Sequence, residues 1–183
     1  WVAPAGPEFE IQCIEDAEEA AEALRKLWLL GMDPIPLMAE LLEERGVKVI
    51  AQDLPVSVSG SKAFVRRNQG PDVPVIVVNE HHNGERQRFT LAHELAHLVL
   101  RCGSLDEKEQ EKAADRFAGA FLMAKEMMIR VLGQHRTSIS LGELAELKKL
   151  FKVSIASLVV RCSQLGVITR AVYGRLFGQI KAL

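Results

Sequence analysis

The sequence has few of the residues that mark disordered, fibrous or disulfide-bonded chains. Its 183 residues include only seven prolines, 13 glycines and three cysteines, and 48% of them are hydrophobic. This usage is typical of one globular domain, or of one domain with a small appendage, and it excludes collagen-like or low-complexity organisation. The chain also has no internal repeat and no Gly-rich loop after a predicted strand, which excludes repeat folds and phosphate-loop nucleotide binding.

The three cysteines, Cys13, Cys102 and Cys162, are odd in number and form no Cys-x-x-Cys pair, which excludes a zinc ribbon and a redox couple. No apolar run approaches the roughly 20 residues that span a bilayer, and the start of the chain lacks the features of a signal peptide. We therefore expect a soluble, cytoplasmic protein with reduced thiols and no membrane contact. Residues 1–13 begin with Trp1 and have no periodicity, so we expect a disordered or cloning-derived start, with chain missing upstream.

Charge is nearly balanced overall but unevenly distributed. The net charge is −1, which argues against a surface built as a whole to bind nucleic acid. Residues 1–46 carry 11 acidic and three basic residues, whereas residues 129–183 carry nine basic and two acidic ones. The asymmetry favours either an acidic lobe docking on a basic lobe, with the rest solvated, or a basic patch for DNA or an acidic partner.

Periodicity and breaker residues predict a mixed chain in which most strands precede most helices. Short runs rich in β-branched or aromatic residues predict strands over 47–51, 63–65 and 75–79. Apolar residues at helical spacing predict helices over 14–30, 36–45, 85–101, 106–122, 125–132, 141–150, 154–163 and 169–177. The order indicates an α+β fold with a small three-stranded sheet.

Two histidines and a glutamate stand in the predicted helix over 85–101 in the pattern His-Glu-x-x-His. His93 and His97 are four residues apart, so both rings lie on one helix face and can reach one ion, while Glu94 is offset toward a metal-bound water. A catalytic zinc usually has three protein ligands and a water. The motif therefore predicts a zinc hydrolase with Glu94 as its catalytic base and with a third ligand elsewhere.

The third ligand is expected in the next helix, over 106–122. Glu111 is favoured because it leads the inward stripe of that helix, where a carboxylate needs a partner, and Glu107, one turn earlier, is the alternative. Asp115, one turn after Glu111, is expected to accept the second N–H of a ligand histidine and so fix its tautomer. Such a ligand set would hold one Zn²⁺, and it would also accept Mn²⁺ or Fe²⁺.

Around this motif the sequence resembles the ImmA/IrrE family of metallo-endopeptidases. The resemblance is carried by residues 88–98 (RFTLAHELAHL), 111–123 (EKAADRFAGAFLM), 20–50 and 144–166. It covers most of residues 14–177. Two departures are Ala124, where the family commonly has Pro, and Ser59-Gly60, where it often has Asp-Gly.

The resemblance implies a zincin-like fold with an active-site helix and a helical C-terminal lobe. It also implies a zinc endopeptidase, with Glu111 as the third ligand, that cleaves a DNA-binding repressor or antitoxin and so derepresses a mobile element or a stress response. In fused members a repressor-type helix-turn-helix precedes the peptidase. We expect the peptidase domain over residues 14–132 and a helix-turn-helix-like lobe over residues 133–183.

Several further residues are weaker candidates for the site. Tyr173 and His135 can each donate a hydrogen bond to an oxyanion, although packing or surface roles are the simpler reading. His81 and His82 follow a predicted strand and read most simply as surface histidines of a loop. A peptide substrate is expected to bind as an added strand along residues 75–79.

The C-terminal segment supports an alternative function. Helices over 144–151 and 155–163, joined by a short turn, have the outline of a helix-turn-helix within the basic segment 129–183. The alternative is a DNA-binding or ligand-sensing transcriptional regulator with a non-catalytic metal site and with DNA contact through this lobe. Side chains that read base edges are scarce there, since Gln164 is the only Asn or Gln between residues 141 and 166.

Overall fold

The computed structural model describes residues 7–182 and confirms the α+β class. The helices are α1 Asp16–Leu27, α2 Met38–Glu44, α3 Gly84–Val99, α4 Glu107–Leu122, α5 Lys125–Leu132, α6 Leu141–Phe151, α7 Ile155–Gln164 and α8 Arg170–Lys181. The strands are β1 Phe9–Glu10, β2 Lys48–Gln52, β3 Gly60–Val65, β4 Val73–Asn79 and β5 Leu100–Arg101. Among the residues described, no helix combines the length and the apolar character needed to cross a membrane.

β4 is the central strand of the three-stranded sheet, whose order is β2-β4-β3. β2 pairs with it in parallel and β3 pairs with it in antiparallel. Both sides of β4 are therefore hydrogen-bonded, and the expectation that residues 75–79 form a substrate-binding edge is wrong. A short apolar run reads alike at the centre and at the edge of a sheet, so periodicity cannot separate the two. Within the described chain, β3 has no strand on its other side and offers a free edge.

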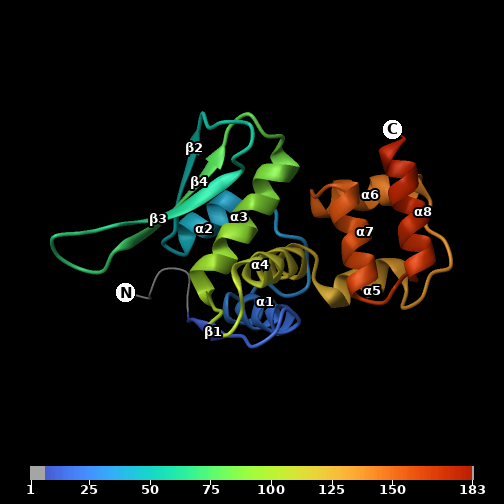
Figure 1. Cartoon of the computed structure of the whole chain (residues 1–183), viewed down its shortest axis with the longest axis horizontal. Helices are drawn as coiled ribbons and strands as arrows, with labels where there is room; N and C mark the ends of the chain where they lie inside the picture. The colour runs from blue at the N-terminus through green and yellow to red at the C-terminus, as the bar shows by residue number, and fades with distance from the viewer. Residues whose placement is uncertain (1–6, 183) are drawn as a thin grey trace.

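α3 lies between the sheet and a second layer of helices (Figure 1). It packs against β3 and β4 on one side and against α4 on the other, and α1 packs on α4. Leu95 of α3 and Phe117 and Phe121 of α4 are fully buried between these layers. Burial on both faces fixes α3, which carries the His-Glu-x-x-His motif.

The two ends of α3 are set by different interactions. At its start, the Asn83 side chain accepts a hydrogen bond from the Arg86 N–H at 2.9 Å, as N-cap residues do. The sequence predicts that the helix continues to Arg101, but it ends at Val99. Leu100 and Arg101 instead form β5 and pair in parallel with β1. This pairing joins residues far apart in the chain, so the local spacing of apolar residues cannot predict it.

The pairing of β1 also corrects the expectation for the N-terminus. Phe9 and Glu10 form the strand, and Ile11 is buried and donates its N–H to the Arg101 carbonyl at 3.0 Å. The expectation of disorder over residues 1–13 is wrong for these three, and a cloning-derived start stays a prediction. The part of that expectation that falls on residues 1–6 lies outside the described residues.

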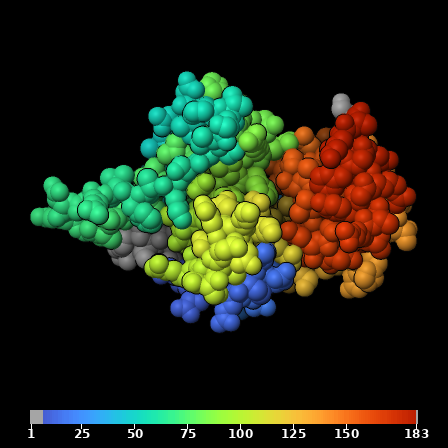
Figure 2. All heavy atoms as spheres, in the orientation of Figure 1, coloured from blue at the N-terminus to red at the C-terminus, as the bar shows by residue number. Residues whose placement is uncertain are grey.

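Helices α6, α7 and α8 lie to one side of the sheet and of α3 (Figure 1), and we call them the C-terminal lobe. In the space-filling view this lobe, in orange and red, abuts the green and yellow part of the molecule (Figure 2). Its helix α7 has no exposed residue and packs against α4, α6 and α8. Arg161 of α7 is buried and forms a bidentate ion pair with Glu18 of α1, at 2.7 and 2.6 Å.

Candidate metal centre

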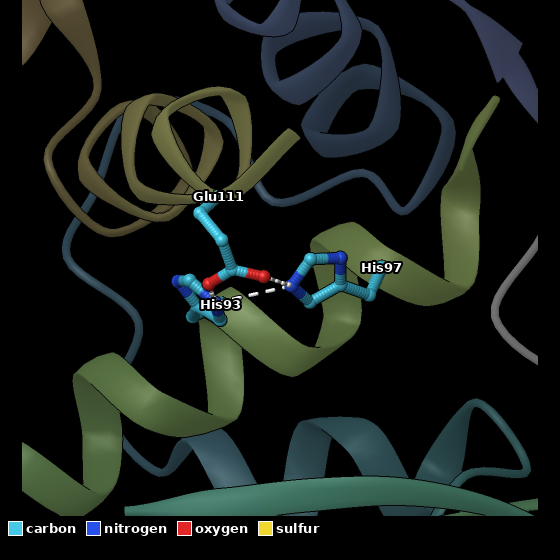
Figure 3. A group of neighbouring side chains, drawn as sticks. All are labelled: His93, His97 and Glu111. Atoms are coloured by element: carbon cyan, nitrogen blue, oxygen red, sulfur yellow. Dashed lines mark hydrogen bonds and ion pairs between the residues drawn. The ribbon is translucent and has the colours of Figure 1, made fainter. Parts of the chain in front are cut away.

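Three side chains from two helices converge on one point (Figure 3). His93 and His97 extend from successive turns of α3, and Glu111 extends from α4 toward them. The two Nε2 atoms are 3.1 Å apart, and Glu111 places Oε2 3.3 Å from His93 Nε2 and Oε1 3.2 Å from His97 Nε2. One ligand atom from each residue lies within 4.8 Å of the others.

A metal ion fits this donor set. Four tetrahedral ligands with bonds of about 2.0–2.1 Å lie about 3.3 Å apart. The two imidazole nitrogens are 3.1 Å apart, which is close to this edge length, and the Glu111 carboxylate turns a different oxygen toward each ring, at 3.3 Å from His93 Nε2 and 3.2 Å from His97 Nε2. Two imidazole nitrogens and a carboxylate oxygen are also ligands that zinc accepts. The donor set therefore fits a three-ligand zinc site, in which a water or a substrate atom would be the fourth ligand.

Asp115 forms a hydrogen bond with His93. Its Oδ1 lies 2.9 Å from His93 Nδ1, so a proton on Nδ1 is donated to Asp115 and Nε2 keeps a free lone pair. Burial alone would lower the pKa of His93, but the hydrogen bond to Asp115 and the charges of Asp115, Glu111 and Glu94 outweigh it and raise the pKa. The same carboxylate thus fixes the tautomer and makes the ring more basic.

The pKa shifts of His97 and Glu94 both favour the neutral form of the side chain. The pKa of His97 is lowered by burial and by the charge of His93. The pKa of Glu94 is raised by burial, against the opposing charges of His93 and Lys62. A neutral imidazole is the ligand form, and a carboxylate with a raised pKa is better matched to proton transfer near neutral pH.

Glu111 reaches the site for a reason other than the one used to predict it. Its side chain is 57% exposed, so it is not directed into the core, and the first buried residues of α4 are Ala113 and Ala114. Glu111 lies in the part of α4 that precedes the buried residues of this helix. Glu107, the alternative at the first position of α4, is not part of the cluster.

Gly60 allows β3 to lie directly against α3 beside Glu94. A Cβ at this position would overlap Thr90 Cγ2, would come within 2.8 Å of the Val77 carbonyl oxygen and would stand 3.7 Å from Glu94 Cγ. Absence of a side chain at Gly60 therefore sets the distance between the edge strand and the helix of the site.

Lys62 is a residue of the site that sequence reasoning missed. It lies two residues after Gly60 on the same face of β3, and its Nζ donates to the His97 carbonyl at 2.8 Å. Burial lowers the pKa of Lys62, while the charges of Glu94, Cys102 and Glu111 oppose the change, which places a cation among these groups. The period-two pattern of a strand would have found it, had β3 been predicted to begin at Gly60.

The remaining candidates lie elsewhere. Tyr173 packs on Phe177 within α8, with ring centroids 4.6 Å apart, and Figure 1 shows α8 well away from the C-terminal half of α3. His135 is exposed between α5 and α6. His81 pairs with Asp53 at 2.9 Å, so it holds a loop of the sheet. The structure does not bring these side chains to the three converging residues.

The fold and the cluster together define a class of protein. A helix with His-Glu-x-x-His, an acidic residue from the next helix and a small mixed sheet beside them are the parts of a metallopeptidase-type domain. The model of a family described as the IrrE N-terminal-like domain, peptidase family M78, matches residues 42–163. The match spans more than half of the chain, so the chain belongs to this family, and the resemblance seen in the sequence is confirmed.

Comparison with solved structures supports the same fold. A Mycobacterium tuberculosis transcriptional regulator is similar over 82% of this chain, with a TM-score of 0.59 and 24% sequence identity. The matched region is 47% of that regulator, so the chain spans about half of its length. No curated protein matches the sequence.

Proposed function

We propose that the chain is a zinc-dependent endopeptidase that hydrolyses a peptide bond in a regulatory protein, such as a DNA-binding repressor or antitoxin. The observation that carries the proposal is the convergence of His93, His97 and Glu111 with Glu94 on the adjacent turn. Membership in a peptidase family supports hydrolysis, and the resemblance to ImmA/IrrE members supports a regulatory substrate.

Each residue of the site has a distinct task in this proposal. His93, His97 and Glu111 would hold Zn²⁺, and Asp115 keeps His93 in the tautomer that binds a metal. When bound there, zinc supplies Lewis-acid polarisation of the scissile carbonyl and lowers the pKa of a water. Glu94 takes the proton of the attacking water and delivers it to the leaving amine, a role that its raised pKa favours.

The free edge of β3 is the proposed position of the substrate backbone. An extended peptide that pairs with Gly60–Val65 would pass directly beside Glu94, because Gly60 brings the strand against α3. Lys62 lies on this path, and an ammonium has three donors, of which one is used by the His97 carbonyl. We propose Lys62, in place of Tyr173, as the donor to a substrate carbonyl.

The test compares three variants by metal content and by cleavage of a quenched fluorescent peptide library. Glu94→Gln is expected to keep the metal and to lose activity by about 10²–10⁴-fold. Glu111→Ala is expected to lose the metal, whereas Glu107→Ala, a matched carboxylate one turn earlier, keeps both metal and activity. Full metal occupancy in Glu111→Ala would refute the ligand set, and unchanged cleavage by Glu94→Gln would refute the assigned base.

The DNA-binding alternative is disfavoured by the burial of α7. In a helix-turn-helix the second helix enters the groove, but here every residue of that helix is buried or half-buried and its Arg161 is paired with Glu18. Fluorescence anisotropy with a random-sequence duplex is therefore expected to show no salt-sensitive binding. Binding that depends on the basic residues of 129–183 would restore the regulator hypothesis.

A further inference from the structure

A cavity lies between α3 and the C-terminal lobe, on a different face of α3 from the metal ligands. Its volume is about 810 Å³, within the range of roughly 300–1,000 Å³ typical of small-molecule sites. It is lined by the first residues of α2, by Gly84, Gln87, Arg88 and Leu91 of α3, and by lysines at the end of α6. These α3 positions are spaced along one helix face, so the interlobe cavity is distinct from the metal site.

One of three buried arginines lacks full compensation, and it is the one that lines this cavity. Arg161 has the carboxylate of Glu18 as its counter-ion. Arg25 donates from all three of its nitrogens to carbonyl oxygens, including that of Phe121 at 2.6 Å. Arg88 is 6% exposed, and its Nε has no hydrogen-bond partner among residues 7–182.

The described residues around Arg88 accept hydrogen bonds from only two of the three nitrogens of its guanidinium and provide no counter-ion. Its Nη2 donates to the Ile35 carbonyl and its Nη1 to the Pro36 carbonyl, but in the described chain no carboxylate lies within 4.0 Å of it. Burial lowers the pKa of Arg88 to about 10, with no nearby acidic group to oppose the change. A buried charge without a counter-ion is costly, and an anion in the cavity would relieve that cost.

The rest of the wall fits an anion that has an apolar part. Four basic side chains and two acidic ones line the cavity, and one of the acids, Glu85, is already paired with Lys148 at 2.9 Å. Lys152 Nζ donates to the Pro36 carbonyl at 3.2 Å. The basic end of α6 therefore faces Ile35 and Pro36, whose carbonyls also accept from Arg88. Leu37, Met38 and Leu91 contribute apolar surface between these charges.

We propose that the interlobe cavity binds a small organic anion, a carboxylate or a phosphate ester with an apolar body, whose charged group is held by Arg88 and the α6 lysines. Such a ligand would tie the N-terminal half of α3 to the C-terminal lobe. The inference does not depend on peptide hydrolysis.

The test uses the whole 183-residue chain freed of metal with EDTA, so that anions cannot bind a metal. Isothermal titration calorimetry with hexanoate and hexyl phosphate is expected to show saturable binding of at least one of them. Hexanol, which lacks the charge, and inorganic phosphate, which lacks the tail, are expected to bind at least tenfold more weakly. If neither hexanoate nor hexyl phosphate binds, the proposal is wrong. If inorganic phosphate binds as tightly as hexyl phosphate, the proposed contribution of an apolar body to binding is refuted.

Variants locate the binding. The double variant Lys148→Gln, Lys152→Gln is expected to weaken the affinity for the tighter-binding probe at least tenfold. Lys108→Gln, at an exposed position of α4, is expected to leave that affinity unchanged. Arg88→Met is expected to abolish binding, with circular dichroism and zinc binding as measures of its folding. Unchanged affinity in the folded double variant would overturn the assignment to this cavity.

Discussion

Replacing Glu18 by Ala tests one of the contacts that join the C-terminal lobe to the rest of the molecule. Glu18 of α1 accepts hydrogen bonds from both Nη atoms of Arg161 in α7 and from Nε of Arg116 in α4, the last at 2.8 Å. The side chain of Arg161 is 1% exposed and that of Glu18 is 13% exposed. Without the carboxylate, Arg161 stays buried with the Met123 carbonyl, 3.0 Å from its Nε, as its remaining partner.

The expected loss is large because a buried charge loses its counter-ion. Removing one partner of a buried ion pair typically costs about 3–5 kcal/mol. For a domain of this size, 1 kcal/mol corresponds to a shift of about 2–4 °C, so the melting temperature is expected to fall by roughly 10 °C. Glu19→Ala, which removes an exposed carboxylate from the same helix turn, is expected to change the free energy of unfolding by less than about 0.5 kcal/mol.

Urea unfolding followed by circular dichroism measures both variants. A loss below about 1 kcal/mol in Glu18→Ala, equal to that in Glu19→Ala, would show that Arg161 finds water or another partner and that the contact does not hold the lobe. Combining Glu18→Ala with Arg161→Met removes both charges and is expected to recover part of the lost stability.

The same ion pair gives a pH dependence with a defined sign. Burial alone would raise the pKa of Glu18, but the hydrogen bonds and charges of Arg161 and Arg116 outweigh it and lower the pKa. A lowered pKa in the folded state contributes stability above the ordinary carboxyl pKa of about 4.3, and this stability is lost as the pH falls through the folded-state pKa. The stability difference between the native chain and Glu18→Gln is therefore expected to be constant near neutral pH and to shrink in acid.

Three further substitutions or reagents test the site and the core. Asp115→Asn should weaken zinc affinity by about 10–100-fold in a chelator competition, because His93 loses the acceptor that fixes its tautomer. Gly60→Ala should cost about 1–3 kcal/mol and reduce cleavage by forcing β3 away from Thr90, while Gly84→Ala, where a Cβ meets nothing within 4 Å, should not. A thiol reagent such as DTNB should modify exposed Cys13 in the native chain but Cys162 only on unfolding, because burial raises the pKa of Cys162 to about 11.

The positions of the two histidines proposed as metal ligands could be predicted because they depend on local helix geometry. The spacing of His93 and His97 requires only that residues 93–97 be helical. The sequence could narrow the third ligand to Glu111 or Glu107, but the choice between them depends on how far α4 extends past its buried part. The structure selects Glu111 while leaving it 57% exposed, which contradicts the argument from core burial.

Features created by tertiary pairing could not be read from the sequence. β1 and β5 are two residues long, and neither is periodic, so only their mutual pairing defines them. The central place of β4 and the free edge of β3 are likewise properties of strand order. The strand pattern could have placed Lys62 on the same face as Gly60, but its contact with the His97 carbonyl exists only once β3 lies against α3.

Side chains from the acidic and from the basic segment of the chain both hold the C-terminal end of α4. Arg25 of α1 donates to the Phe121 carbonyl and Arg161 of α7 donates to the Met123 carbonyl, so helices from the acidic and the basic segments both bind the C-terminal end of α4. These carbonyls have no partner within α4, as at any helix end. Since α4 also carries Glu111 and Asp115, the contacts that fix its far end bear on the position of both carboxylates relative to α3. The C-terminal lobe is therefore part of the framework that positions the site, whether or not it binds a ligand of its own.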